Sequence, residues 1–304
     1  MSFMLRPRSL QDQVAALLVL LTVTLSSPLL SAQYSKTDCA SCKVWNAPQQ
    51  PFKIYGNTYY VGTHGLSSIL ITSPSGHILI DGDLPESAAQ IRDHIRALGF
   101  RIEDVKLILN SHVHFDHAGG IAKLQQWSHA RVVASEPSAP VLSKGGVGKD
   151  DPQYGILPPI AKVKHVEVFH DGDVLRVGNL SVTAHLTPGH TPGGTSWTWK
   201  SCEGTQCLNM VFADSLTAVS APGFKFTEHP DLLKGFEKSF AFLETTPCDI
   251  LITTHPEISG LWDRLERRNQ AAKPDPMIDS GACRALAANA RGQLQKRLES
   301  EGNH

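Results

Sequence analysis

The sequence has almost no net charge, because 28 basic side chains balance 29 acidic ones across 304 residues. It also has no internal linker, low-complexity tract or long run of like charges. A chain this close to neutral lacks the basic surface with which proteins bind nucleic acid or anionic membranes. We therefore expect neither partner. The absence of a Gly-x-Ser-x-Gly segment argues further against a serine hydrolase of the nucleophile-elbow type.

No long apolar run of transmembrane length occurs near the N-terminus. The run over residues 14–25 is shorter than the roughly 20 residues that span a bilayer. Arg6 and Arg8 precede it and Ala32 offers a cleavage point, which is the pattern of a secretory signal peptide. We expect residues 1–32 to be this signal, with an uncleaved anchor as the alternative. The mature protein would then be periplasmic or secreted, without a membrane contact.

The remaining chain is long enough for one sizeable core. We expect residues 33–50 to form a flexible N-terminal segment and residues 51–304 to form one domain. Loss of the signal would remove two basic residues and one acidic residue, leaving 26 and 28, so the mature chain also stays near neutral.

A His-rich segment follows the apolar, β-branched run 105–109, which is typical of a buried strand. It places His112, His114, Asp116 and His117 within six positions. Imidazole nitrogens and carboxylate oxygens are both good zinc ligands. His112 and His114 alternate, so they can point the same way, whereas Asp116 and His117 can turn to a second ion. The spacing therefore suggests two neighbouring metals at a strand end, rather than a surface loop rich in histidine.

Two further histidines have the same context. His190 lies in a Pro- and Gly-rich turn after the alternating strand 180–186, and His255 follows the apolar run 249–254. Ligands at three strand ends are typical of a catalytic metal site. Among the other histidines, His64 lies in a Gly-flanked loop that could approach this site.

The six cysteines all lie outside the metal motifs. Cys202 and Cys207 flank a short turn between two strands, so we expect a disulfide across it. A bridge from Cys248 to Cys283 would attach the C-terminal helix to the strand before His255. The Cys39-x-x-Cys42 pair is either a small disulfide loop or two free thiols.

The hydrophobic pattern alternates strands with helices. Hairpins are expected over 54–61 and 68–81, and helices over 86–98, 231–243 and 282–298. Residues 138–161 are rich in Gly, Pro and Ser and should form a long surface loop near the site. Strands followed by a helix, repeated once, suggest two stacked sheets with helices outside.

With the segment His112-x-His114-x-Asp116-His117 followed by His190 and His255, the chain resembles the metallo-β-lactamase superfamily over about residues 50–300. Ser196-Trp197-Thr198-Trp199 and the segment 212–218 make it most similar to class B β-lactamases of the third subclass, which use His rather than Cys at the second zinc. The resemblance implies an α+β fold, a four-layer αβ/βα sandwich of two stacked mixed sheets with helices on the outer faces.

The resemblance also implies a cofactor of two Zn²⁺ per chain. The first zinc would be held by His112, His114 and His190. The second would be held by Asp116, His117 and His255. A zinc-bound hydroxide would attack the ring amide of a β-lactam (penicillins, cephalosporins or carbapenems), with Asp116 as the catalytic residue that orients it.

Substrate contacts follow from the same resemblance. Ser215 stands where other subclasses have a Cys ligand, and Thr217 would bond the carboxylate of the drug. Gln153 is a further candidate for a substrate contact. The expected partner is thus a small β-lactam molecule, the expected state is a monomer, and the expected consequence is antibiotic resistance.

Two other functions remain open on the sequence. The same scaffold hosts lactonases, thioester hydrolases and phosphodiesterases, in which an Asp from the region of Asp214 bridges the metals. A non-enzymatic zinc-binding protein is the second alternative, but structural zinc sites favour Cys and closed shells of four ligands.

Overall fold

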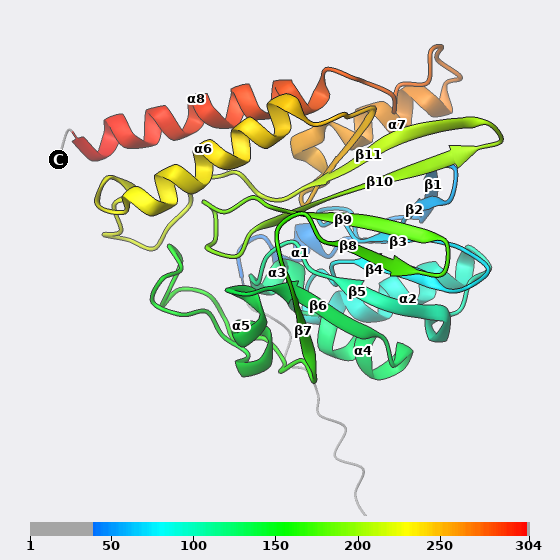
Figure 1. The fold of residues 1–304 in the computed structure, drawn as a ribbon, viewed down its shortest axis with the longest axis horizontal. Helices are drawn as coiled ribbons and strands as arrows, with labels where there is room; N and C mark the ends of the chain where they lie inside the picture. Colours follow the sequence, from blue (N-terminus) through cyan, green and yellow to red (C-terminus); the bar gives the residue numbers. More distant parts are fainter. Residues whose placement is uncertain (1–38, 303–304) are drawn as a thin grey trace, which may run out of the picture. The chain divides into compact units, whose positions relative to one another are not determined.

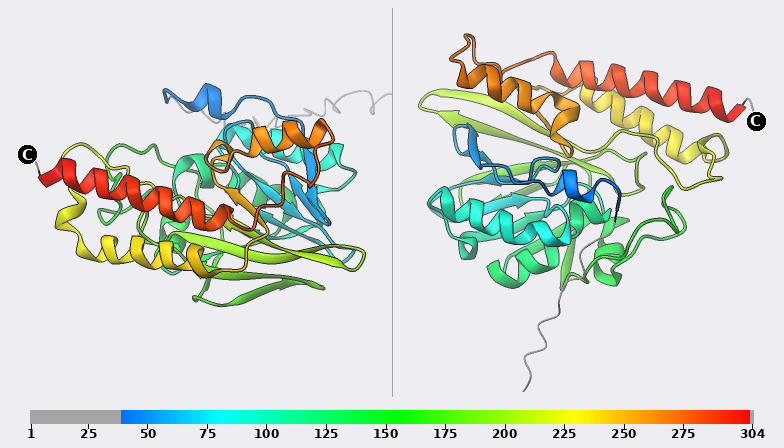
Figure 2. Two further views of the ribbon diagram at one scale, coloured as in Figure 1. Left: turned by 90° about the horizontal axis from the view of Figure 1, so that it is seen from above. Right: turned by 180° about the vertical axis from the view of Figure 1, so that it is seen from behind.

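The computed structural model describes residues 39–302, and these residues form four layers (Figures 1 and 2). Two β-sheets lie face to face, and helices cover the outer face of each sheet. This is the four-layer arrangement expected from the sequence. The expected signal peptide over 1–32 lies outside the described residues.

The first sheet has seven strands in sequence order, antiparallel from β1 to β4 and parallel from β4 to β7. Its strands are β1 (Phe52–Tyr55), β2 (Thr58–Tyr60), β3 (Ile69–Ile71), β4 (His77–Ile80), β5 (Val105–Leu109), β6 (Arg131–Ser135) and β7 (Val166–Phe169).

The second sheet has the order β12-β11-β10-β9-β8, in which only the pair β11 and β12 is parallel. Its strands are β8 (Val174–Val177), β9 (Leu180–Leu186), β10 (Thr195–Glu203), β11 (Gln206–Ala213) and β12 (Ile250–Thr253).

The helices of the described chain connect and cover these strands. They are α1 (Cys42–Trp45), α2 (Ala88–Ala97), α3 (Phe115–Ala118), α4 (Ile121–Ser128), α5 (Ser138–Lys144), α6 (Pro230–Thr245), α7 (Leu261–Asn269) and α8 (Ala282–Gly302), with short 3-10 turns at Pro85–Ser87, Ile102–Asp104, Phe226–Glu228 and Pro256–Ser259. None of the helices within residues 39–302 is long and apolar enough to cross a membrane.

Alternating side chains of the strands build the layers. In β4, Ile78 and Ile80 face the second sheet, whereas Leu79 faces the helices α2 and α4. Trp197 and Phe212 fill the space between the sheets from the opposite side. Because the central strands of the first sheet are buried on both faces, they read as continuous apolar runs in the sequence.

The second outer layer consists of α6 and α8, which lie along the second sheet (Figure 1). Phe236, Phe240 and Leu243 of α6 are fully buried against Val211 and Leu251. The 3.6-residue spacing of these apolar side chains is what predicted the helix.

The structure differs from the sequence prediction in three places. The segment 138–161 is not a loop throughout, because it begins with α5, whose Leu142 is buried in the first core. The helix α7 was not predicted. The described part of the expected flexible segment 33–50 packs on the domain, because Cys42 is buried and Trp45 contacts Phe115.

All six cysteines form disulfides. The predicted bridges Cys202–Cys207 and Cys248–Cys283 are both present. Of the two alternatives for the N-terminal pair, the structure has the disulfide between Cys39 and Cys42. These bonds are typical of proteins that fold in an oxidising compartment.

The lengths of the disulfide loops predict unequal effects on stability. Cys248 and Cys283 are 35 residues apart, so replacing both with serine should lower the free energy of unfolding by roughly 4 kcal/mol through the entropy of the unfolded chain. Cys202 and Cys207 are only 5 apart, and the same replacement should cost about 2 kcal/mol. Urea unfolding of both double variants measures this. Equal losses would contradict the loop-length account.

Candidate metal centre

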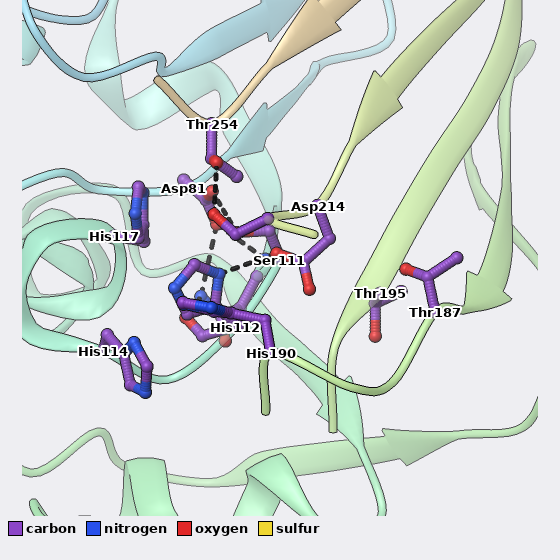
Figure 3. A network of polar contacts seen from close by, with 12 residues as sticks. Asp81, Ser111, His112, His114, His117, Thr187, His190, Thr195, Asp214 and Thr254 are labelled. Carbon is purple, nitrogen blue, oxygen red and sulfur yellow. Dashed lines mark hydrogen bonds and ion pairs between the residues drawn. The ribbon is translucent and has the colours of Figure 1, made fainter. Parts of the chain in front are cut away.

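Four of the predicted metal-site residues, His112, His114, His117 and His190, lie together in the structure (Figure 3). His112, His114 and His117 follow the end of β5, His190 follows β9 and His255 follows β12. All three strands belong to the apolar core, so their ends are fixed by packing. Side chains on these connections are therefore held by a rigid scaffold.

The turn after the His-rich segment depends on a close approach of two backbones. The amide of Gly82 donates to the carbonyl of His117 at 2.8 Å, and that of Gly120 donates to Asp83 at 3.2 Å. A Cβ on Gly120 would lie 2.2 Å from the carbonyl oxygen of Gly82. Only glycine fits there, which explains the Gly-Gly pair after the metal motif.

One group consists of His112, His114 and His190, whose nearest ligand atoms all lie within 4.8 Å of one another. Each ring is held by an acceptor on its other nitrogen. His112 Nδ1 is 2.7 Å from Asp214 Oδ1, and His190 Nδ1 donates to the carbonyl of Thr217 at 2.8 Å. The hydrogen bond on one nitrogen fixes the tautomer that leaves the other nitrogen free for a metal.

A second group consists of His112, Asp116 and His117, with ligand atoms again within 4.8 Å. Because His112 belongs to both groups, the two groups adjoin. His255 lies beside the second group, with Nε2 3.5 Å from Asp116 Oδ2 and its ring centroid 4.9 Å from that of His117. The structure thus gathers all six predicted ligands in one place.

Buried nitrogen atoms without a partner mark where a cation fits. His112 Nε2 and His117 Nδ1 are both buried and accept or donate no hydrogen bond within residues 39–302. Unpaired buried polar atoms are costly unless something binds them. Burial lowers the pKa of His112, His117 and His190, that of His190 to about 3, so the rings are neutral as metal ligands must be.

Asp116 is held in its ionised form. Burial raises the pKa of this carboxyl, but the contacts with His117 and His255 outweigh burial and keep the pKa well below its usual range. Neutral imidazoles and an ionised carboxylate form the donor set that divalent zinc prefers. The residues present therefore fit a pair of zinc ions.

Asp81 holds the segment that precedes His112 in place. Its carboxylate accepts hydrogen bonds from the amide of Ser111 at 2.7 Å, from Ser111 Oγ at 2.5 Å and from Asn110 Nδ2 at 3.2 Å (Figure 3). Burial raises the pKa of Asp81 to about 7 despite these bonds. A role for Asp81 is not predicted from the sequence, although this residue follows an apolar strand in the same way as the histidine-bearing segments do.

The three predicted substrate-contact residues make different contacts in the structure. Ser215 is buried, and its hydroxyl is bonded to Thr254 Oγ1 at 2.8 Å. Thr217 is partly exposed, and its Oγ1 is 3.2 Å from His190 Nδ1. Gln153 is buried beside His114, with Nε2 3.3 Å from Nδ1. These contacts place Thr217 and Gln153 next to the first group.

His64 does not join the site. Its ring stacks on Trp262 with centroids 4.8 Å apart, and Nδ1 lies 3.2 Å from Gln49 Oε1. The loop that carries it does approach the site, because the carbonyl of Gly65 lies 3.2 Å from His255 Nδ1. The contribution of this loop is thus a backbone carbonyl rather than the imidazole.

Comparison with known proteins identifies the class. Residues 61–255 match the profile of the metallo-beta-lactamase superfamily, and the chain belongs to this family. Among solved structures, Rm3 metallo-beta-lactamase is 56% identical, with 88% of this chain and 100% of that chain covered and a TM-score of 0.85. MEM-A1, a subclass B3 metallo-beta-lactamase from a soil metagenome library, is 51% identical over 85% and 99% of the two chains, with a TM-score of 0.83.

A more distant relative has a different activity. The N-acyl homoserine lactonase AttM of Agrobacterium fabrum is 32% identical over 222 residues, which are 62% of this chain and 81% of that protein. The family and the four-layer fold predicted from the sequence are thus confirmed, and the similarity to subclass B3 structures is the stronger one.

The hydrogen bonds of Asp81 predict a stability effect. Asp81→Ala leaves the N–H and O–H groups of Ser111 without an acceptor and removes one of the two acceptors of Asn110 Nδ2, so we expect the free energy of unfolding to fall by about 2–4 kcal/mol. Urea denaturation measures this. The same substitution at the exposed Asp150 should change stability by less than about 0.5 kcal/mol. An Asp81→Ala protein as stable as wild type would refute the supporting role.

Proposed function

We propose that this protein is a zinc-dependent β-lactamase that opens the ring amide of penicillins, cephalosporins and carbapenems. The observation that carries the proposal is the pair of adjoining, buried His/Asp groups in a chain that is about half identical to subclass B3 enzymes over most of its length.

Two zinc ions per chain are the cofactor that we propose. His112, His114 and His190 would hold the first ion, and Asp116, His117 and His255 the second. When bound, zinc supplies Lewis-acid chemistry, because it polarises a carbonyl oxygen and lowers the pKa of water to near neutrality. The hydrogen-bonded second nitrogens of His112 and His190 fix the rings in place for this role.

Asp116 is the catalytic residue in this proposal. Its Oδ2 lies between His117 at 3.4 Å and His255 at 3.5 Å. An ionised carboxylate at this position accepts a hydrogen bond from the attacking water and orients it toward the amide carbonyl. No serine or cysteine nucleophile is needed.

The substrate contacts are hydroxyl and amide groups. Thr217 is partly exposed and its Oγ1 borders His190, so this hydroxyl can donate to the carboxylate of the drug. Gln153 borders His114 and supplies an amide next to the same group. The Ser215 hydroxyl is engaged with Thr254 Oγ1, so we do not assign it a direct contact with the substrate.

The lactonase alternative requires Asp214 to bridge the two metals. In this structure, Asp214 Oδ1 instead contacts His112 Nδ1 on the side away from the unpaired Nε2. A Cβ on Gly194 would lie 2.4 Å from Asp214 Oδ2, so this oxygen packs closely against Gly194. Asp214 therefore serves as the outer partner of a ligand, which favours the β-lactamase over the lactonase.

We also propose that the protein acts in the periplasm or after secretion, as a monomer, and confers resistance to β-lactams. The three disulfides support export.

The activity is tested by spectrophotometric assay of a penicillin, a cephalosporin and a carbapenem, with added zinc and then with a chelator. We expect zinc-dependent turnover of β-lactams that the chelator abolishes. N-acyl homoserine lactone and hydroxyacylglutathione serve as competing substrates. Turnover of either one, with none of the β-lactams, would contradict the proposal.

Loss of a ligand should remove metal and activity together. We expect His112→Ala and His255→Ala to lower kcat/KM for a carbapenem by about 100-fold or more and to reduce the zinc content of the purified protein. The matched control is His170→Ala, because the side chain of His170 is 80% exposed and lies outside the site. Full zinc content in both ligand variants would show that the metal assignment is wrong.

The hydroxyl of Thr217 should act on substrate binding. Thr217→Val keeps the shape of the side chain but removes the donor, so we expect KM to rise about 10-fold with kcat changed much less. Thr217→Ser keeps the hydroxyl and should stay near wild type. A fall in kcat with unchanged KM would instead place Thr217 in the chemical step.

A further inference from the structure

Asp151 is a buried carboxylate that touches the metal centre from a loop. It lies between α5 and β7, and only 3% of its surface is exposed. Its Oδ2 and Oδ1 are 3.1 Å and 3.3 Å from His114 Nε2. This contact was not foreseen from the sequence, and neither the fold nor the proposed catalytic step requires it.

The same carboxylate also fixes the loop that carries it. Asp151 Oδ1 accepts the backbone N–H of Gln153 at 2.8 Å. The next residue, Pro152, accepts the N–H of Ala221 at 2.8 Å, which ties this loop to the one that follows Thr217. Asp151 thus contacts both His114 and Gln153, and its neighbour Pro152 connects the same loop to Ala221.

Two contacts assign the protonation of His114. The Nε2–H group donates to Asp151, and the amide of Gln153 donates to Nδ1 at 3.3 Å. Both contacts require the lone pair to be on Nδ1. Nδ1 is therefore the nitrogen of His114 that keeps a lone pair with which to bind a metal.

We propose that Asp151 is a positioning residue for the first metal, which sets the tautomer and orientation of His114 and couples them to the placement of Gln153. The proposal rests on the metal site of the proposed function, but not on the identity of the substrate. Asp151 and Asp214 have parallel roles in this proposal. Asp214 holds His112 from the end of β11, and Asp151 holds His114 from the loop between α5 and β7.

An amide cannot replace this carboxylate. Asp151 Oδ1 accepts from the Gln153 backbone and Oδ2 is the oxygen nearer to His114 Nε2, whereas Asn has an oxygen at only one of these two positions. Asp151→Asn must therefore either release the loop or present an N–H group to His114 Nε2. The second arrangement favours the opposite tautomer, in which Nδ1 carries the proton and cannot bind a metal.

The test measures zinc binding to metal-free protein by competition with a chelating dye. We expect Asp151→Asn to weaken the binding of one of the two zinc ions by about 10–100-fold and to leave the other within a few fold. Asp150→Asn is the matched control, because it makes the same chemical change at the adjacent, exposed aspartate and should leave both affinities unchanged.

A second measurement does not depend on the variant folding. Long-range ¹H–¹⁵N correlation spectra of metal-free wild-type protein report the tautomer of each histidine, with His114→Gln identifying the signals. We expect the Nε2–H form for His114, and the Nδ1–H form would overturn the proposal.

The outcomes separate this proposal from the proposed function. Two zinc ions bound equally by wild type and Asp151→Asn would overturn the role of Asp151 and leave the β-lactamase intact. Selective loss of one zinc in a protein without β-lactam turnover would support Asp151 and overturn the substrate. A wild-type protein that binds no zinc would overturn both.

Discussion

The structure of the site depends on hydrogen bonds that hold the histidines from outside. Asp214 holds His112 from the end of β11, and the carbonyl of Thr217 holds His190. Because one nitrogen of each ring is engaged in this way, the other nitrogen is left for a metal, and His112 Nε2 is buried without a partner among residues 39–302. Neutral imidazoles crowded into a buried space are unfavourable unless a cation binds them, and this constraint explains why the acceptors around the rings matter as much as the rings.

The four-layer fold supplies the rigidity that these hydrogen bonds need. The strands that end at the site contribute Leu109, Ala184 and Ile252 to the core between the sheets. Because these side chains are closely packed between the sheets, the strand ends have little freedom to move. The distances among the ligands are therefore set before any metal binds. The approach of Gly82 to Gly120 adds a second constraint, which fixes the turn that carries the His-rich segment. A preorganised site of this kind suits a hydrolase, because no reorganisation is needed during the reaction.

Much of this could be predicted from the sequence, and the rest could not for identifiable reasons. The ligand positions were visible because each histidine follows an apolar run, and the layers were visible because the strands and helices have clear periodicity. The helix α5 was missed because its Gly- and Pro-rich surroundings resemble a loop. Asp151 was missed because its contact with His114 spans 37 residues and has no local pattern. The role of Asp214 could not be predicted, because Asp214 and Ser215 are adjacent and the sequence does not show which of the two side chains points toward the metals. The structure shows that Asp214 contacts His112 Nδ1.

The most direct test of the central claim is anomalous diffraction at the zinc edge from crystals of the zinc-loaded protein. We expect two zinc peaks. The first should be bound by His112, His114 and His190, and the second by Asp116, His117 and His255. The carboxylate of Asp214 should remain on His112 Nδ1, away from both ions. A single peak, or two ions bridged by Asp214, would contradict this account and favour a hydrolase of the lactonase type.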